Sequence, residues 1–115
     1  MQYMIMNYVK TGEFADSTRP ETDPDGPAWG DYTKALIAAD VMRGGNALHP
    51  THAATTVRIR NGQQEVQDGP YAATQEQLGG YYIIEAPNLD AALDWAAKNP
   101  AASFGAVEVR PILTM

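Results

Sequence analysis

The stretch "ATTVRIRNGQQEVQDG", residues 54–69, consists of two runs of strand-forming residues on either side of Asn61-Gly62. This dipeptide favours the type I′ turn of a β-hairpin with a two-residue loop. Such a loop sets the register, because each residue before it faces the residue equally far behind it. The predicted facing pairs are Arg60 with Gln63, Arg58 with Glu65, Val57 with Val66, and Thr55 with Asp68. In this register Arg58 and Glu65 form a cross-strand charge pair.

Asp68 lies at the end of the hairpin face that carries Val57, Ile59 and Val66. A carboxylate at the edge of an apolar face has the surroundings of an acid, a base or a ligand anchor at the rim of a pocket. The alternative is an ordinary Asp-Gly-Pro turn, in which the Asp68 side chain bonds its own backbone. The sequence leaves both interpretations open.

Periodicity and turn residues predict the other elements. Strands are expected over residues 2–9, 80–86 and 106–113, and a short extended piece over 46–50. One helix is expected from Pro27 to Gly44-Gly45, and a second from the N-cap Asn88 to Asn99-Pro100. Their buried stripes are predicted to be Ala28, Tyr32, Ala35, Leu36, Ala39 and Met42 in the first helix, and Leu89, Ala92, Leu93 and Ala96 in the second. Residues 10–26 are read as an acidic solvated loop, with a flap over a site as the alternative.

The resulting order is β-α-β-β-β-α-β, an α+β domain with an antiparallel sheet. Two helices cover only one face of such a sheet. The strands at 2–9 and 80–86 nevertheless carry apolar side chains on both faces. The sequence therefore predicts a homodimer that packs sheet against sheet, a ferredoxin-like domain paired into a dimeric α+β barrel.

The composition limits the partners and the compartment. The 115 residues form a single domain, 1–115, with a net charge of −6 and eight basic residues that form no run. This charge argues against nucleic acid or an anionic membrane as a partner. The absence of cysteine excludes disulfides, thiolate metal sites and a cysteine nucleophile. It also fits a reducing cytoplasm, and because residues 1–6 lack the features of a signal peptide, a cytoplasmic location is expected.

A series of motifs in this chain resembles the YCII-related family, and specifically its DGPF branch. The Asp-Gly-Pro-Phe tetrapeptide that names the branch reads Asp68-Gly69-Pro70-Tyr71 here. "EQLGGYY" (76–82), "EAP" (85–87) and "VEVRP" (107–111) follow it, and "MQYMIMNY" (1–8) and "MRGGNALHP" (42–50) precede it. The resemblance covers nearly the whole chain.

The resemblance implies a ferredoxin-like fold in a dimeric α+β barrel, in bacterial cytoplasm, with no established reaction. For the parent YCII group a His–Asp pair is suggested as the active site, with the histidine early in the first helix. That helix reads "PAWGDYTKALIAAD" (27–40) here and has no histidine, so the pair does not carry over. The DGPF branch is associated with sigma factors of the extracytoplasmic-function type.

Asp68 and His49 are the candidate catalytic residues. His49 lies a few residues before the hairpin, where a carboxylate would orient its imidazole and stabilise the charged form. The alternative is that His49 and His52 are ordinary loop histidines beside Pro50. Two histidines and an acid are also residue types of a metal site, but no second motif accompanies them, and no metal or cofactor is expected.

The candidate ligand contacts are Arg58, Tyr8, Tyr71 and His52. A guanidinium binds carboxylate or phosphate groups bidentately, which suits Arg58 to an anionic ligand. Its pairing with Glu65 is the simpler explanation. The two tyrosines are also the kind of residue that fills a core or a dimer interface.

Two functional hypotheses follow. The first is a dimer that binds a small polar or anionic molecule near Asp68, with acid–base chemistry through Asp68 and His49 if it is an enzyme. The alternative is a non-enzymatic regulatory or interaction module that works beside a sigma factor. An enzyme needs a solvent-reachable carboxylate among groups that position a substrate. An interaction module needs an exposed apolar patch outside the dimer interface.

Overall fold

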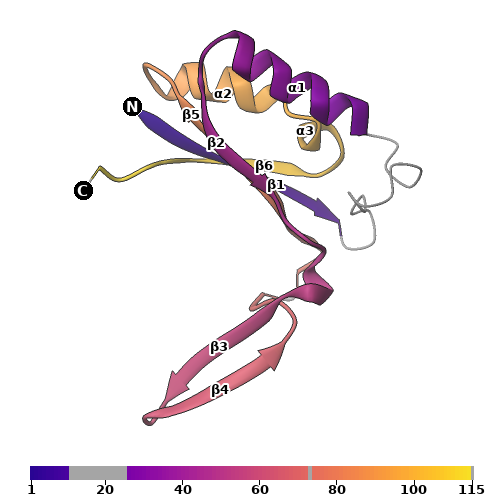
Figure 1. Ribbon diagram of the computed structural model, residues 1–115, viewed down its shortest axis with the longest axis vertical. Coiled ribbons are helices and arrows are strands. Elements are labelled where there is room, and N and C mark those ends of the chain that lie inside the picture. Colours follow the sequence, from indigo (N-terminus) through magenta and orange to yellow (C-terminus); the bar gives the residue numbers. More distant parts are fainter. Residues whose placement is uncertain (11–25, 73, 115) are drawn as a thin grey trace.

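The computed structural model describes residues 1–10, 26–72 and 74–114, which contain a four-stranded sheet and a separate two-stranded hairpin (Figure 1). The larger sheet has the strand order β2-β5-β1-β6, and all its pairs are antiparallel. Its strands are β1 (Gln2–Lys10), β2 (Met42–Ala47), β5 (Glu76–Glu85) and β6 (Ala106–Pro111). The helices are α1 (Gly26–Ala38), α2 (Leu89–Ala97) and the short α3 (Ala101–Phe104). This is the predicted ferredoxin-like α+β architecture, with a hairpin inserted between β2 and β5.

The core lies between the larger sheet and the two longer helices. Tyr3 and Ile5 of β1 and Ile84 of β5 pack against Leu36 of α1 and Ala92 of α2. The rings of Tyr32 and Tyr82 meet edge to face, with centroids 5.3 Å apart and an interplanar angle of 83°. Both helices therefore cover the same face of the sheet, as the ribbon in Figure 1 shows.

The other face of the sheet is not covered by any helix of the described residues. Because side chains alternate along a strand, the neighbours of the core residues point to this side. The apolar residues on this face, hereafter the open face, are Met4, Met6 and Tyr8 of β1 and Tyr81 and Ile83 of β5. The strand register places Met4 opposite Ile83 and Met6 opposite Tyr81. The predicted apolar side chains are thus present on both faces, but on the open face Met6 is only 9% exposed and the other four are partly buried in the single chain.

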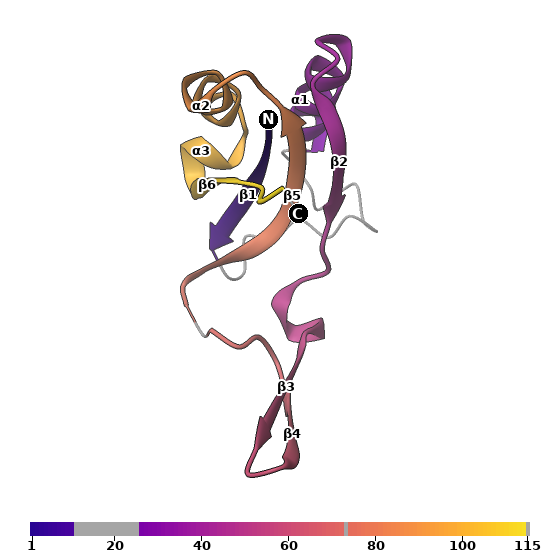
Figure 2. The same cartoon turned by 90° about the vertical axis from the view of Figure 1, so that its left-hand side faces the viewer.

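The hairpin of β3 (Thr55–Arg60) and β4 (Gln63–Asp68) projects away from the sheet and helices (Figures 1 and 2). Its register is the predicted one, with Thr55 opposite Asp68 and Arg58 opposite Glu65. Asn61 and Gly62 both have positive φ angles, 53° and 76°, as a type I′ turn requires. A short 3₁₀ helix, η2 (Thr51–Ala53), precedes the hairpin.

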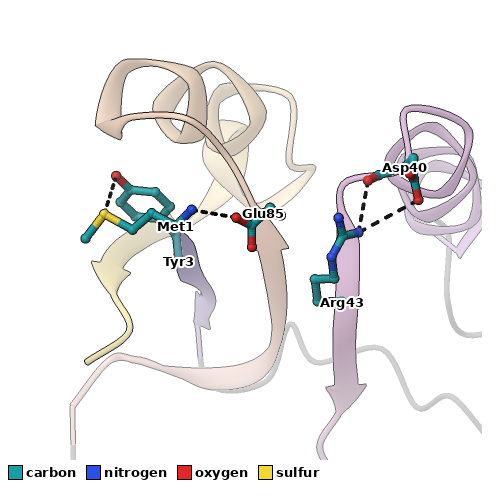
Figure 3. Close-up of polar contacts among 5 residues, drawn as sticks. All are labelled: Met1, Tyr3, Asp40, Arg43 and Glu85. Carbon is teal, nitrogen blue, oxygen red and sulfur yellow. Dashed lines mark hydrogen bonds and ion pairs between the residues drawn. The ribbon is translucent and has the colours of Figure 1, made fainter. Parts of the chain in front are cut away.

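The first helix ends earlier than predicted. It stops at Ala38, because Asp40 adopts a left-handed conformation with φ 57° that breaks the helix. Arg43 then donates to the Asp40 carbonyl oxygen at 2.9 Å and steadies this turn (Figure 3). The predicted helix end, Gly44-Gly45, and the predicted helix residue Met42 both belong to β2.

The predicted buried stripes are only partly correct. Tyr32, Leu36, Ala92 and Ala96 are buried, but Leu89 and Leu93 are 47% and 46% exposed. The other exposed members are Ala28, Ala35 and Ala39. α2 turns its alanine face toward the sheet, because small side chains let the helix axis approach closely, and this leaves the two leucines outside.

The ends of β1 and α2 are fixed by polar contacts. The Asn88 side chain accepts from the Ala91 N–H at 2.9 Å, which confirms the predicted N-cap of α2. The amino group of Met1 lies 2.5 Å from a Glu85 carboxylate oxygen and joins the start of β1 to the end of β5 (Figure 3). The hydrogen bond from this ammonium group lowers the pKa of the Glu85 carboxyl. None of the described helices is long and apolar enough to span a membrane.

Candidate functional site

The turn that carries Asp68 is held by backbone contacts. The Gly69 N–H donates to the Ala54 carbonyl at 2.7 Å, and the Thr56 hydroxyl donates to the Gly69 carbonyl at 2.9 Å. Gly69 has a φ of 99°, a conformation that favours glycine. The Asp68 side chain is exposed. It makes no hydrogen bond or ion pair within residues 1–10, 26–72 and 74–114, so its carboxylate is open to solvent at the root of the hairpin.

Arg58 lies against Tyr71. The guanidinium carbon is 4.6 Å from the centre of the Tyr71 ring, within the range of a cation–π contact. The chain reverses at Gly69-Pro70 and brings the ring of Tyr71 back over β3. The predicted charge pair is not formed: Glu65 faces Arg58 in register, but no ion pair joins them, because the guanidinium lies on the ring instead.

The Nε atom of Arg58 is buried and has no hydrogen-bond partner among the described residues. A buried, unpaired polar group is costly, and more so when it belongs to a charged side chain. The Arg58 guanidinium is thus held on the Tyr71 ring while its buried Nε lacks a partner among the described residues. The contact between Arg58 and Tyr71 could be predicted only in part. Both residues were expected as ligand contacts, but the sequence did not predict that they lie against each other.

Asp68 and Arg58 point to opposite faces of the hairpin. Asp68 is paired with Thr55 and shares the face of Val57, whereas Arg58 alternates to the other side. Asp68 lies at the root of the hairpin opposite Thr55, whereas Arg58 lies in the turn-side half of β3 opposite Glu65. A ligand that touches both must reach around the β4 edge.

The two histidines lie in the segment between β2 and β3. His49 and His52 are exposed, and His52 belongs to η2. Neither makes a hydrogen bond or ion pair with a described residue. Within the described part of the chain, no group of three or more histidine, aspartate and glutamate side chains is placed to hold a metal ion.

Tyr8 lies on the open face near the point where the chain leaves the sheet for the hairpin. It pairs with Leu78 of β5 and with Ala106 of β6. Burial, and then the negative charge of Glu108, raise the pKa of the Tyr8 phenol. A hydrogen bond with the Glu108 side chain raises this pKa further, so the phenol stays protonated and neutral.

Comparison with known proteins supplies the family. The pattern of the YCII-related domain matches residues 1–115. The protein belongs to the YCII-related family. An uncharacterised protein of Rhizobium meliloti (strain 1021) is 49% identical to it over 67 residues, which make up 56% of this chain and 54% of the relative. The chain thus spans about half the length of the curated relative that it matches.

A solved structure shares the fold of this YCII-related protein. It is the 5-chloro-2-hydroxyhydroquinone dehydrochlorinase of Burkholderia phenoliruptrix AC1100, in complex with 2,5-dihydroxybenzoquinone. The TM-score is 0.54, and the likeness covers 98% of this chain and 94% of that one. The two sequences are 18% identical, so the comparison supports the fold and leaves the chemistry of this protein to its own residues.

The YCII-related chain also contains a cavity that the sequence did not predict. It lies between α1 and the α2–α3 region, has a volume of about 460 Å³, and is lined by Asp31, Tyr32, Trp95, Lys98, Ser103 and Phe104 among others. The cavity arises where two helices meet on the outer side of the core. Periodicity can mark which residues of each helix are buried, but not which surface residues of two helices end up face to face.

Proposed function

We propose that this protein is a cytoplasmic homodimer of the DGPF type that binds a small anionic molecule at the root of the hairpin. The observation that carries the proposal is the Arg58 guanidinium, which lies on Tyr71 with its buried Nε unpaired. A carboxylate or phosphate group matches the fork of a guanidinium. Tyr71 fixes the plane of the fork by stacking.

The role of Tyr71 supports the placement in the DGPF branch. The tetrapeptide of that branch ends in phenylalanine, and position 71 here carries tyrosine. Stacking on Arg58 uses the ring face, which both residues offer. A tyrosine at this position therefore preserves the physical role of the phenylalanine.

Asp68 and His49 give the site its possible chemistry. Asp68 is reachable from solvent but lies on the other face of the hairpin from Arg58, so it would act as an acid or base on the part of a ligand that reaches around the β4 edge. In a single chain the Asp68 side chain faces open solvent. Catalysis would need a second surface that closes over Asp68, with His52 and Tyr8 as further ligand contacts.

A second copy of the chain is the proposed source of that surface. The hairpin face that carries Asp68 also carries Val57, Ile59 and Val66, which are 56%, 60% and 59% exposed. An isolated two-stranded hairpin is marginally stable in water, and a row of exposed apolar side chains favours a partner. The open face of the sheet is a second apolar surface without cover. If two copies paired through these surfaces, the apolar hairpin face and the open face of the sheet would both be buried, and the roots of the hairpins would be enclosed.

The alternative, an interaction module that works beside an extracytoplasmic-function sigma factor, stays a prediction. Leu89 and Leu93 form a small exposed apolar stripe on α2, away from the surfaces assigned to the dimer. Neither the Rhizobium meliloti relative nor the dehydrochlorinase structure is described as a partner of a sigma factor. We therefore place the ligand-binding role first.

A thermal-shift series with small carboxylates and inorganic phosphate tests the proposed site. A ligand that binds the folded state raises the melting temperature, and we expect at least one anion to do so for the native protein. The shift should be lost in Arg58→Gln. It should be kept in the control Arg60→Gln, since Arg60 lies on the same hairpin face but is exposed and donates to the Ile59 carbonyl. Equal protection of native protein and Arg58→Gln, or no protection by any anion, would contradict the proposal.

A further inference from the structure

The cavity between α1 and the α2–α3 region has the dimensions and the walls of a ligand site. Its volume of about 460 Å³ falls within the range of small-molecule pockets, about 300–1,000 Å³. Trp95 and Phe104 supply apolar surface, and both are half-buried. Such pockets are mostly apolar and carry a few polar groups that orient the ligand.

The floor of this groove is rigid. Tyr32 is buried, with 5% of its surface exposed, and its hydroxyl donates to the Trp95 carbonyl at 2.9 Å. This bond ties α1 to α2 directly beneath the cavity. The groove is therefore formed before a ligand arrives, which lowers the entropic cost of binding.

The walls carry one charge of each sign. Asp31 belongs to α1, and Lys98 follows α2 with its ammonium group 4.8 Å from the centre of the Trp95 ring. Both side chains line the cavity, and no ion pair joins them or links either one to another described residue. Asp31 and Lys98 are both exposed and border the same groove, so a ligand that carries a charge of each sign can pair with both.

We propose that this groove is a second ligand site, distinct from the hairpin root, for a small zwitterion with an apolar group. The ammonium group of the ligand lies against Asp31, its carboxylate against Lys98, and its apolar part against Trp95 and Phe104. A molecule with only a negative charge would leave Asp31 unpaired and repelled. A molecule with only a positive charge would be repelled by Lys98.

Three probes with the same ring and carbon chain separate these cases. They are phenylalanine (zwitterion), 3-phenylpropionate (anion) and 2-phenylethylamine (cation). Binding is followed by the indole ¹⁵N–¹H cross-peak of Trp95, which the variant Trp29→Phe distinguishes from that of the other tryptophan. We expect phenylalanine to shift this peak with a dissociation constant on the order of tenfold lower than either singly charged probe.

Charge variants then test the two contacts. Asp31→Asn should remove the advantage of phenylalanine over 3-phenylpropionate, and Lys98→Met should remove its advantage over 2-phenylethylamine. The controls Lys34→Gln and Asp94→Asn change exposed charges on the same two helices outside the cavity lining, and they should preserve the preference. Arg58→Gln should bind phenylalanine as the native protein does, so failure at the hairpin and failure here remain distinguishable.

The inference is overturned if none of the probes shifts the Trp95 peak at concentrations up to about 10 mM, where even weak small-molecule sites fill. It is also overturned if 3-phenylpropionate or 2-phenylethylamine binds as tightly as phenylalanine, because the groove would then not bind both charged groups of the zwitterion.

Discussion

Asn7 and Asn99, 92 positions apart, are joined by a buried hydrogen bond in which the Asn99 amide nitrogen donates to the Asn7 side-chain oxygen at 2.6 Å. Asn7 is 6% exposed and Asn99 is 2% exposed. The side-chain oxygen of Asn99 accepts from the Ala101 N–H at 2.9 Å. Since an N–H can only donate, this second bond fixes which end of the Asn99 amide faces Asn7. One side chain thus holds the start of α3 against the centre of β1.

Replacing Asn99 should therefore be costly. Asn99→Ala leaves the Asn7 oxygen and the Ala101 N–H buried without partners, and we expect a loss of about 2–3 kcal/mol in the free energy of unfolding. Urea denaturation measures it. Asn88→Ala is the matched control, because Asn88 is an exposed cap with one bond to the Ala91 N–H, and its loss should cost about 1 kcal/mol. An equal loss in the free energy of unfolding for the two variants would show that the buried Asn7–Asn99 pair stabilises the fold no more than an exposed cap does.

Gly105 and Gly30 should respond oppositely to alanine. A Cβ on Gly105 would fall almost onto the Tyr8 carbonyl oxygen and close to Val9, so Gly105→Ala must move the backbone of β1 or α3 and should destabilise by more than about 2 kcal/mol. Gly30 lies on the exposed side of α1 with nothing near its Cβ position. Gly30→Ala should stabilise by roughly 0.5–1 kcal/mol. Thermal denaturation of both variants checks the pair, and a neutral Gly105→Ala would refute the close packing of α3 on β1.

Tyr32 should make stability fall in alkali. Burial, and then the neighbouring Tyr82, raise the pKa of the Tyr32 phenol well above its usual value. The folded state therefore favours the neutral phenol. This contribution is complete below about pH 10, the pKa in the unfolded chain, and is lost as the pH rises toward the folded value. Tyr32→Phe should cost about 1 kcal/mol at neutral pH through the lost bond to the Trp95 carbonyl.

The same variant should also flatten the alkaline limb of the stability curve. Urea midpoints measured between pH 8 and pH 11 compare the two proteins. If the urea midpoints of the native protein and of Tyr32→Phe fall in parallel above pH 10, Tyr32 ionises as easily in the folded chain as in the unfolded one.

The hairpin could be predicted from sequence because its information is local. Asn61-Gly62 determines the turn, the turn determines the register, and the structure repeats every predicted pair. The strand β1 and the α2 cap at Asn88 follow equally from residues close in sequence. These features need no knowledge of what lies across the fold. The bounds of two other strands were wrong, because β2 runs over Met42–Ala47 instead of 46–50 and β5 begins at Glu76 instead of residue 80.

The incorrect predictions concern features that depend on contacts between residues far apart in the sequence. Gly44-Gly45 resembled a helix end, but a Cβ on Gly45 would lie 2.9 Å from the Tyr81 carbonyl oxygen, so this glycine is needed for close strand packing. Leu89 and Leu93 follow a helical stripe, but α2 is rotated to place its alanines on the sheet. Arg58 was predicted to pair with Glu65, and the turn at Gly69-Pro70 supplied Tyr71 instead. The proposed role of Asp68 depends on a second copy of the chain and stays a prediction.

Sedimentation equilibrium of the native protein and of Ile59→Glu tests the central claim, a binding site enclosed by two copies through the hairpin arm. The account predicts a native mass of twice the 12.5 kDa of one chain. Ile59→Glu should move the mass toward 12.5 kDa with an unchanged circular dichroism spectrum, because Ile59 is 60% exposed in the single chain. Gln63→Glu, on the opposite face of the hairpin, should remain dimeric. A native protein that sediments at 12.5 kDa at every concentration would contradict the account.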